Sequence, residues 1–98
     1  MADIYQSAWF AGIGDHQCRI VIEEKGPIYY EFLEYDDGKR DPFQWSDDQK
    51  LICGRGLTRM GSRCLDADPT LVQDIRLFLR SLPKGSKIVR NGTKVVQL

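Results

Sequence analysis

The chain has 98 residues, 42% of them hydrophobic, and its 14 Lys and Arg residues balance 14 Asp and Glu residues to a formal net charge of zero. This length leaves room for a single domain, residues 1–98, and the composition excludes collagen-like and disordered chains. No run of about 18 apolar residues is present, so the sequence predicts no segment that crosses a membrane.

The first predicted elements are β-strands. Residues 5–10 are expected to form one strand. The β-branched run Ile20-Val21-Ile22 lies within a second strand, residues 18–24, and the aromatic-rich segment 28–35 forms a third. Because only Lys25-Gly26-Pro27 separates the last two strands, we expect them to pair as a hairpin.

The middle of the chain gives weaker signals. Asp36-Asp37-Gly38 predicts a turn, followed by a loop. Ser46-Asp47-Asp48-Gln49 matches a helix capping box, which predicts a short helix through Leu51 and Ile52, and a short strand at the same place fits equally well. Residues 54–67 contain three Gly and three Arg residues and are expected to form a loop, with room for one more strand.

The strongest helix signal follows this loop. Asp68 is a typical N-cap and Pro69 a typical first helical residue, while Pro83 and Gly85 end the pattern. The residues between them predict a helix over 69–82, with one apolar stripe formed by Leu71, Val72, Ile75, Phe78, Leu79 and Leu82.

A second hairpin is predicted at the C-terminal end. Asn91-Gly92 separates two β-branched runs, residues 87–90 and 93–98, and this dipeptide favours a tight type I′ turn. The predicted fold class is therefore α+β. We expect a small domain in which an antiparallel sheet of four to five strands, including both hairpins, packs on the helix.

The zero net charge hides an uneven distribution. Residues 1–48 hold 11 acidic and four basic residues, a net of −7, whereas residues 49–98 hold three acidic and ten basic residues, a net of +7. Nine of the ten aromatic residues lie at or before Trp45. Two interpretations are open. Either the two halves face each other and pair within the fold, or at least one of them is a recognition surface.

Carboxylates and tyrosines in the first half suit a basic protein partner, because Arg pairs with carboxylates and stacks on aromatic rings. Glu23 and Glu31 lie on adjacent predicted strands and are expected to face the same way. We predict a non-enzymatic interaction module or inhibitor that acts as a nucleic-acid mimic on a nucleic-acid-handling protein. Small inhibitors from phages and mobile elements share this size and charge pattern. The predicted binding residues are Glu23, Glu31, Glu34, Asp36, Asp37, Tyr29 and Tyr35.

The basic half offers an alternative function, nucleic-acid binding through phosphate contacts. Arg76 and Arg80 are four residues apart and share a helix face. This half lacks the aromatic residues that stack on bases, and no nucleic-acid-binding motif is present. The residues of this alternative are Arg55, Arg59, Arg63, Arg76, Arg80 and Lys87.

Three cysteines, Cys18, Cys53 and Cys64, cannot all pair within one chain, and the first residues do not resemble a signal peptide. We therefore expect reduced thiols and a cytoplasmic monomer or homodimer. His16 near Cys18 raises a second alternative, a small enzyme that uses Cys18 or Cys64. The cysteine spacing does not fit a zinc site, and Arg59 stands where a dinucleotide-binding loop needs Gly, so we expect neither a metal nor a cofactor.

Overall fold

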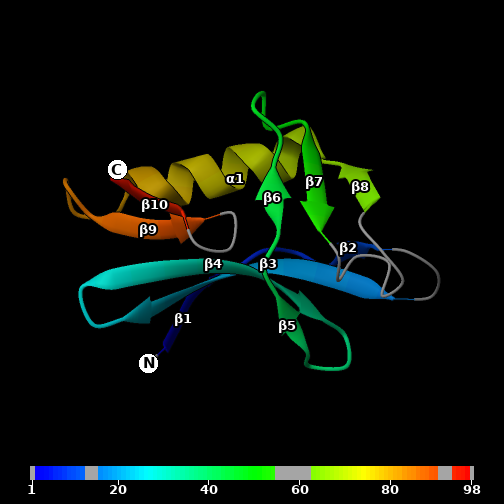
Figure 1. Ribbon diagram of the computed structural model, residues 1–98, viewed down its shortest axis with the longest axis horizontal. Coiled ribbons are helices and arrows are strands. Elements are labelled where there is room, and N and C mark those ends of the chain that lie inside the picture. Colours follow the sequence, from blue (N-terminus) through cyan, green and yellow to red (C-terminus); the bar gives the residue numbers. More distant parts are fainter. Residues whose placement is uncertain (1, 13–15, 55–62, 91–93, 98) are drawn as a thin grey trace.

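The computed structural model describes residues 2–12, 16–54, 63–90 and 94–97, which form two β-sheets and one α-helix (Figure 1). The larger, seven-stranded sheet has the order β1-β3-β4-β9-β10, with β2 beside β3 and β5 beside β4. Its strands are β1 (Ala2–Gln6), β2 (Phe10–Ala11), β3 (Gln17–Lys25), β4 (Ile28–Tyr35), β5 (Arg40–Asp41), β9 (Lys87–Arg90) and β10 (Lys94–Gln97). The smaller sheet contains β6 (Gln44–Trp45), β7 (Leu51–Gly54) and β8 (Arg63–Asp66), and the helix is α1 (Pro69–Arg80).

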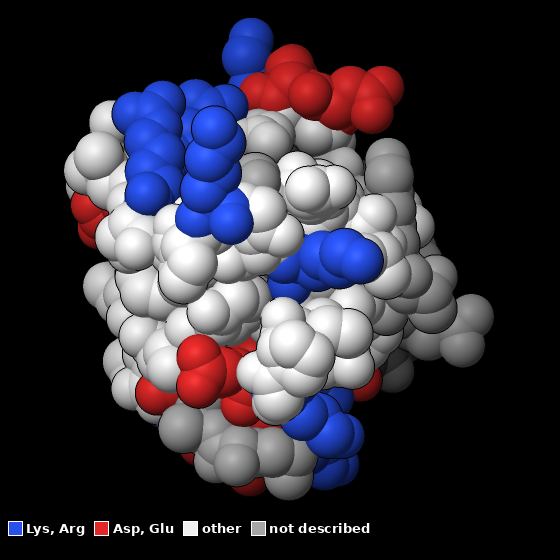
Figure 2. Space-filling model, turned by 90° about the vertical axis from the view of Figure 1, so that its left-hand side faces the viewer, with Lys and Arg blue, Asp and Glu red and all other residues white. Residues whose placement is uncertain are grey.

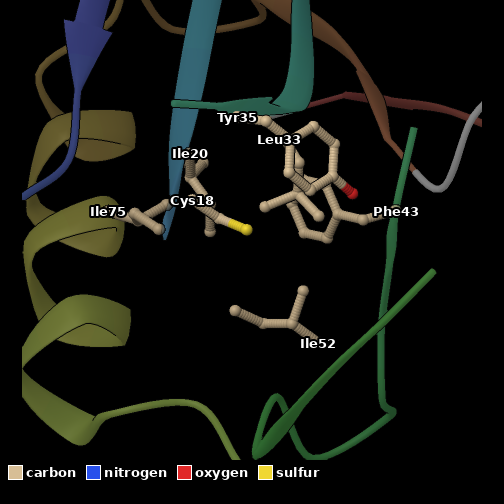
Figure 3. Packing of buried hydrophobic residues seen from close by; sticks show 7 residues of the cluster. All are labelled: Cys18, Ile20, Leu33, Tyr35, Phe43, Ile52 and Ile75. Atoms are coloured by element: carbon tan, nitrogen blue, oxygen red, sulfur yellow. The ribbon is translucent and has the colours of Figure 1, made fainter. Parts of the chain in front are cut away.

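The helix and the smaller sheet lie on the same side of the larger sheet, and the main core lies between them (Figure 1). Figure 3 shows side chains from all three converging there. The buried members of this cluster are Cys18, Ile20, Leu33, Tyr35, Phe43, Ile52 and Ile75. A second cluster around Ile22, Tyr29 and Ile88 is covered by Phe78 in the last turns of α1 and by Leu82 just after the helix. The α+β class is confirmed, with one helix packed on sheet in the described residues.

The predicted first hairpin is confirmed as β3 and β4. Lys25 pairs with Ile28 across a two-residue turn, and Gly26 adopts a φ of 62°, which favours glycine. This turn fixes the register, and it places Glu31 opposite Ile22 and Glu23 opposite Tyr30. Because alternate residues of a strand point to opposite faces, Glu31 faces the core while Glu23 faces away from it. The expected common facing of these two residues is wrong.

The helix prediction is confirmed, with the helix ending two residues earlier than expected. The side chain of Asp68 accepts a hydrogen bond from the Thr70 backbone N–H at 2.7 Å, and Pro69 is the first helical residue. Ser81 caps the other end. The described part of the chain contains no helix with the length and apolarity that crossing a membrane requires.

After the helix the chain returns to the larger sheet, where the prediction of a purely antiparallel sheet is wrong. Strand β9 pairs with β4 in parallel, with Tyr29 beside Ile88. Parallel neighbours need a long crossover connection, and the segment from β5 through α1 provides it. Strands β9 and β10 form the predicted antiparallel hairpin, whereas its Asn91-Gly92 turn lies outside the described residues.

The smaller sheet corrects the prediction for the middle of the chain. The capping-box sequence at Ser46 forms the turn between β6 and β7 instead of starting a helix. The Ser46 side-chain oxygen accepts hydrogen bonds from the backbone N–H groups of Lys50 and Leu51, at 3.0 and 3.1 Å. Gln49 has a φ of 59°, so the chain turns back at this point. The alternative, a short strand at Leu51-Ile52-Cys53, is confirmed as β7, which extends one residue further to Gly54.

Strands β7 and β8 are joined by a disulfide between Cys53 and Cys64, which lie directly opposite each other. The expectation of three reduced thiols is therefore wrong for these two. The third cysteine, Cys18, is fully buried in the main core. In so short a sheet the covalent link holds β8 against β7 and closes the loop between them.

A buried ion pair joins two neighbouring strands of the larger sheet, and a hydrogen bond links it to the smaller sheet. Glu31 in β4 has a fully buried side chain, and Arg90 in β9 donates to it from Nε at 2.8 Å and from Nη2 at 3.1 Å. The indole N–H of Trp45 in β6 donates to the same carboxylate at 3.0 Å. One carboxylate thus receives three hydrogen bonds, from its neighbouring strand and from the smaller sheet.

We predict that Arg90→Met lowers the free energy of unfolding by about 3–5 kcal/mol, because it leaves a buried carboxylate without its counter-charge. The double variant Glu31→Gln/Arg90→Met removes both charges and keeps an oxygen for Trp45, so it should be more stable than the single variant. Urea unfolding monitored by circular dichroism measures both. Equal losses in the two variants would show that Arg90 acts by packing and not by charge.

We also predict that Cys53→Ser/Cys64→Ser lowers the free energy of unfolding by about 2–4 kcal/mol, since the disulfide restricts the unfolded chain. Adding dithiothreitol to the wild-type protein should produce a similar decrease and should leave the double variant unchanged. Thermal denaturation with and without the reductant tests this. A wild-type midpoint that does not respond to the reductant would contradict the assigned role of the disulfide.

Candidate functional site

The seven residues of the predicted acidic surface do not form one exposed surface. Glu31, Glu34, Tyr29 and Tyr35 are buried, with between 2% and 9% of each residue exposed. Glu31 is already bound by Arg90 and Trp45. The buried tyrosines belong to the core clusters, because alternate β4 side chains face α1 and the smaller sheet.

The carboxylates on the opposite face of the larger sheet are neutralised locally. Arg40 donates to Asp3 at 2.7 Å, to Glu34 at 2.9 Å and to Glu23 at 3.2 Å. Arg19 also pairs with Glu34. Both cations belong to the acidic half of the sequence, so most of its pairing occurs within that half. The pair between Glu31 and Arg90 joins the two halves.

Asp36 and Asp37 are exposed in the turn after β4, where they serve the backbone. The Gln17 backbone N–H donates to Asp36 at 3.0 Å, and His16 lies 3.4 Å from the same carboxylate. These two contacts, the backbone bond first, hold the pKa of Asp36 below its ordinary value. Asp37 accepts a hydrogen bond from the Lys39 backbone N–H. Both side chains therefore shape the turn.

The basic set is only partly described. Arg55 and Arg59 lie outside the described residues, and Arg63 lies in β8. Arg76, Arg80 and Lys87 are exposed, as is Lys84, which the prediction did not include. Arg76 donates to the side chain of Gln49 at 3.0 Å. Arg80 and Lys84 lie at the C-terminal end of α1, and whether these cations bind nucleic acid stays a prediction.

The cysteine-based alternatives find little support. Cys18 is fully buried, and Cys53 and Cys64 form the disulfide. His16 lies just before β3 and pairs with Asp36, not with a cysteine. In the described parts of the chain, no three His, Cys, Asp or Glu side chains are grouped so that they could hold a metal ion.

A groove lies at the N-terminal end of α1. Its volume is about 330 Å³. The segment Ala8–Ala11 forms one wall of the groove. The end of β8 and the first turns of α1 form the other wall. Figure 1 shows β2, β8 and this end of α1 on the same side of the molecule as β7. The groove is lined by Ala8, Trp9, Phe10, Ala11, Ile52, Asp66, Asp68, Thr70, Leu71 and Asp74.

The first wall exists because strand pairing is interrupted between β1 and β2. Ser7 is buried and exchanges hydrogen bonds with the Ile20 backbone, both at 2.9 Å. Pairing resumes where Phe10 lies opposite Cys18. The residues between them leave the sheet, and Trp9 is 43% exposed. The Arg19 guanidinium lies 4.5 Å from the centre of the Trp9 ring and holds this side chain in place.

The second wall carries the charge of the groove. Asp66, Asp68 and Asp74 are exposed, and the described residues that line the groove include no Lys or Arg. Asp68 also caps the helix, whereas Asp66 and Asp74 make no hydrogen bond or ion pair with the other described residues. This negative potential lies beside an apolar floor formed by Phe10, Ile52 and Leu71.

The sequence prediction missed this groove. Its residues come from three segments that are far apart in the chain, and its three carboxylates belong to the half that was identified as basic. The one available signal was Trp9, a large aromatic residue between Ala8 and Phe10, but it was assigned to a strand.

Comparison with known proteins found no family model that matches the chain, and neither a curated protein nor a solved structure matches it.

Proposed function

We propose that the protein is a non-enzymatic interaction module that binds a basic segment of a protein partner in the groove between Ala8–Ala11 and the N-terminal end of α1. The observation that carries this proposal is the combination of an apolar floor, an exposed Trp9 and three carboxylates without a cation in the described lining. This keeps the predicted class of function and moves the acidic surface from β3 and β4 to the groove.

The apolar part of the groove would supply most of the affinity. An exposed Trp beside an apolar floor is the kind of anchor that contributes strongly when a partner covers it. Arg19 and the resumed pairing of β2 hold Trp9 before any partner arrives, so little ordering is needed on binding.

The carboxylates would select the partner. Asp66 and Asp74 form no ion pair with the other described residues, so Lys or Arg from a partner would displace no cation of the described chain. Pairs at the rim of an interface mainly set the association rate and its dependence on salt. A partner segment with alternating basic and aliphatic side chains matches both parts of the groove. Where the bound segment belongs to the partner's own functional surface, binding would inhibit that partner by occlusion.

We predict that an amidated peptide of alternating Arg and Leu binds the wild-type protein and that Trp9→Ala weakens this binding by tenfold or more. Truncating a central aromatic anchor of an interface costs about 2 kcal/mol of binding free energy. A loss of about 1.4 kcal/mol already raises the Kd tenfold. Asp66→Asn/Asp74→Asn should also weaken binding and reduce its dependence on salt. Isothermal titration calorimetry at two salt concentrations measures both effects.

A matched control is Glu24→Gln/Asp47→Asn, which removes two exposed carboxylates that do not line the groove. If this control weakens peptide binding as much as Asp66→Asn/Asp74→Asn, the groove is not the binding site. Absence of peptide binding at low salt would refute the proposed function.

Nucleic-acid binding is the second candidate, and the exposed basic side chains at the other end of α1 favour it. Figure 2 shows Lys and Arg side chains gathered at the upper left of the face that it views. We predict that, if this candidate holds, single-stranded DNA is retained in a filter assay at low salt and Arg80→Glu/Lys84→Glu abolishes retention. Absence of retention by the wild-type protein would remove this candidate.

A further inference from the structure

The C-terminal end of α1 forms a surface complementary to the groove. A hollow of about 360 Å³ is lined by the apolar residues Leu79, Leu82 and Pro83 and by two cations, Arg80 and Lys84. Both cations are exposed, and neither forms an ion pair with a carboxylate of the described residues. We call this surface the basic hollow.

The two ends of α1 therefore differ in both shape and charge. At its N-terminal end an exposed Trp9 stands beside three carboxylates, and at its C-terminal end an apolar hollow lies between two cations. Leu71 in the groove and Leu79 in the basic hollow are roughly 12 Å apart along the helix axis, from the rise of an α-helix. The two surfaces are separate, so both can be occupied at the same time.

We infer that the partner segment for the groove is the basic hollow of a second copy of this chain. In this arrangement, which rests on the proposed function, Trp9 of one copy enters the hollow formed by Leu79, Leu82 and Pro83 of the other. Asp66 and Asp74 then pair with Arg80 and Lys84. Arg80 can also lie against the Trp9 ring, because a guanidinium is attracted to an aromatic face.

This contact is heterologous, because different surfaces of the two copies meet. It leaves one free groove and one free basic hollow on every pair, so the assembly continues head to tail instead of stopping at a dimer. One aromatic anchor with a few exposed ion pairs makes a small interface, and such contacts are weak and sensitive to salt. We therefore expect self-association at high protein concentration and low salt.

The test uses two variants that each lack one surface. Trp9→Ala/Asp74→Ala removes the groove, and Arg80→Ala/Lys84→Ala removes the basic hollow; the changed positions are exposed, so circular dichroism should show an intact fold. We expect the mass of the wild-type protein, measured by sedimentation equilibrium, to rise with concentration. Each variant alone should stay monomeric. An equimolar mixture of the two variants should form a dimer, in which the groove of one variant binds the basic hollow of the other. Nothing larger should form, because neither chain of that dimer has a second functional surface.

Three results would overturn the inference. The first is a wild-type mass that does not change with concentration. If the Arg-Leu peptide still binds in that case, the proposed function survives and only the identity of the partner is wrong. The second is a dimer formed by either variant alone, which would indicate a symmetric contact elsewhere. The third is an association that disappears after nuclease treatment, which would show that nucleic acid bridges the copies.

Discussion

The buried carboxylate of Glu31 imposes the main constraint on this fold. Strand β4 places every second side chain toward the core, and the series Tyr29, Glu31, Leu33 and Tyr35 puts a charge among apolar residues. A buried carboxylate needs a counter-charge and hydrogen-bond donors. Arg90 meets the first need only because β9 runs parallel beside β4, and Trp45 meets the second only because the smaller sheet lies over the same face. One residue thus ties together three distant segments of the chain.

Pairing within the fold also decides which charges remain available to a partner. Arg19 and Arg40 neutralise the carboxylates on the outer face of the larger sheet, and Arg90 neutralises Glu31. Charges that form no ion pair with the other described residues are left at both ends of α1, with Asp66 and Asp74 near its start and Arg80 and Lys84 near its end. Carboxylates near a helix N-terminus and cations near its C-terminus are favoured by the helix dipole. The arrangement that stabilises the helix thus also leaves two complementary surfaces.

The fold was predictable where the signal was local. Asp68-Pro69 and the apolar stripe predicted α1, and Gly26-Pro27 predicted the β3–β4 hairpin, since caps and turns depend on neighbouring residues. The facing of Glu23 and Glu31 was not predictable, because a shift of one residue in the register reverses every side chain. The smaller sheet was missed because a strand of two residues, such as β6, carries no periodicity. The groove was missed because Trp9, Ile52 and Asp74 meet only after folding.

The three carboxylates of the proposed binding groove differ in their contacts with the rest of the described chain. Asp68 accepts a hydrogen bond from the first turn of α1, so its charge contributes to the helix whether or not a partner is present. Asp66 and Asp74 make no such hydrogen bond with the other described residues, so the N-cap of α1 does not need them. Exposed carboxylates hold water, so they keep this apolar groove hydrated when it is empty. Because a cation must displace that water, the same charges favour a partner that brings Arg or Lys next to an apolar side chain.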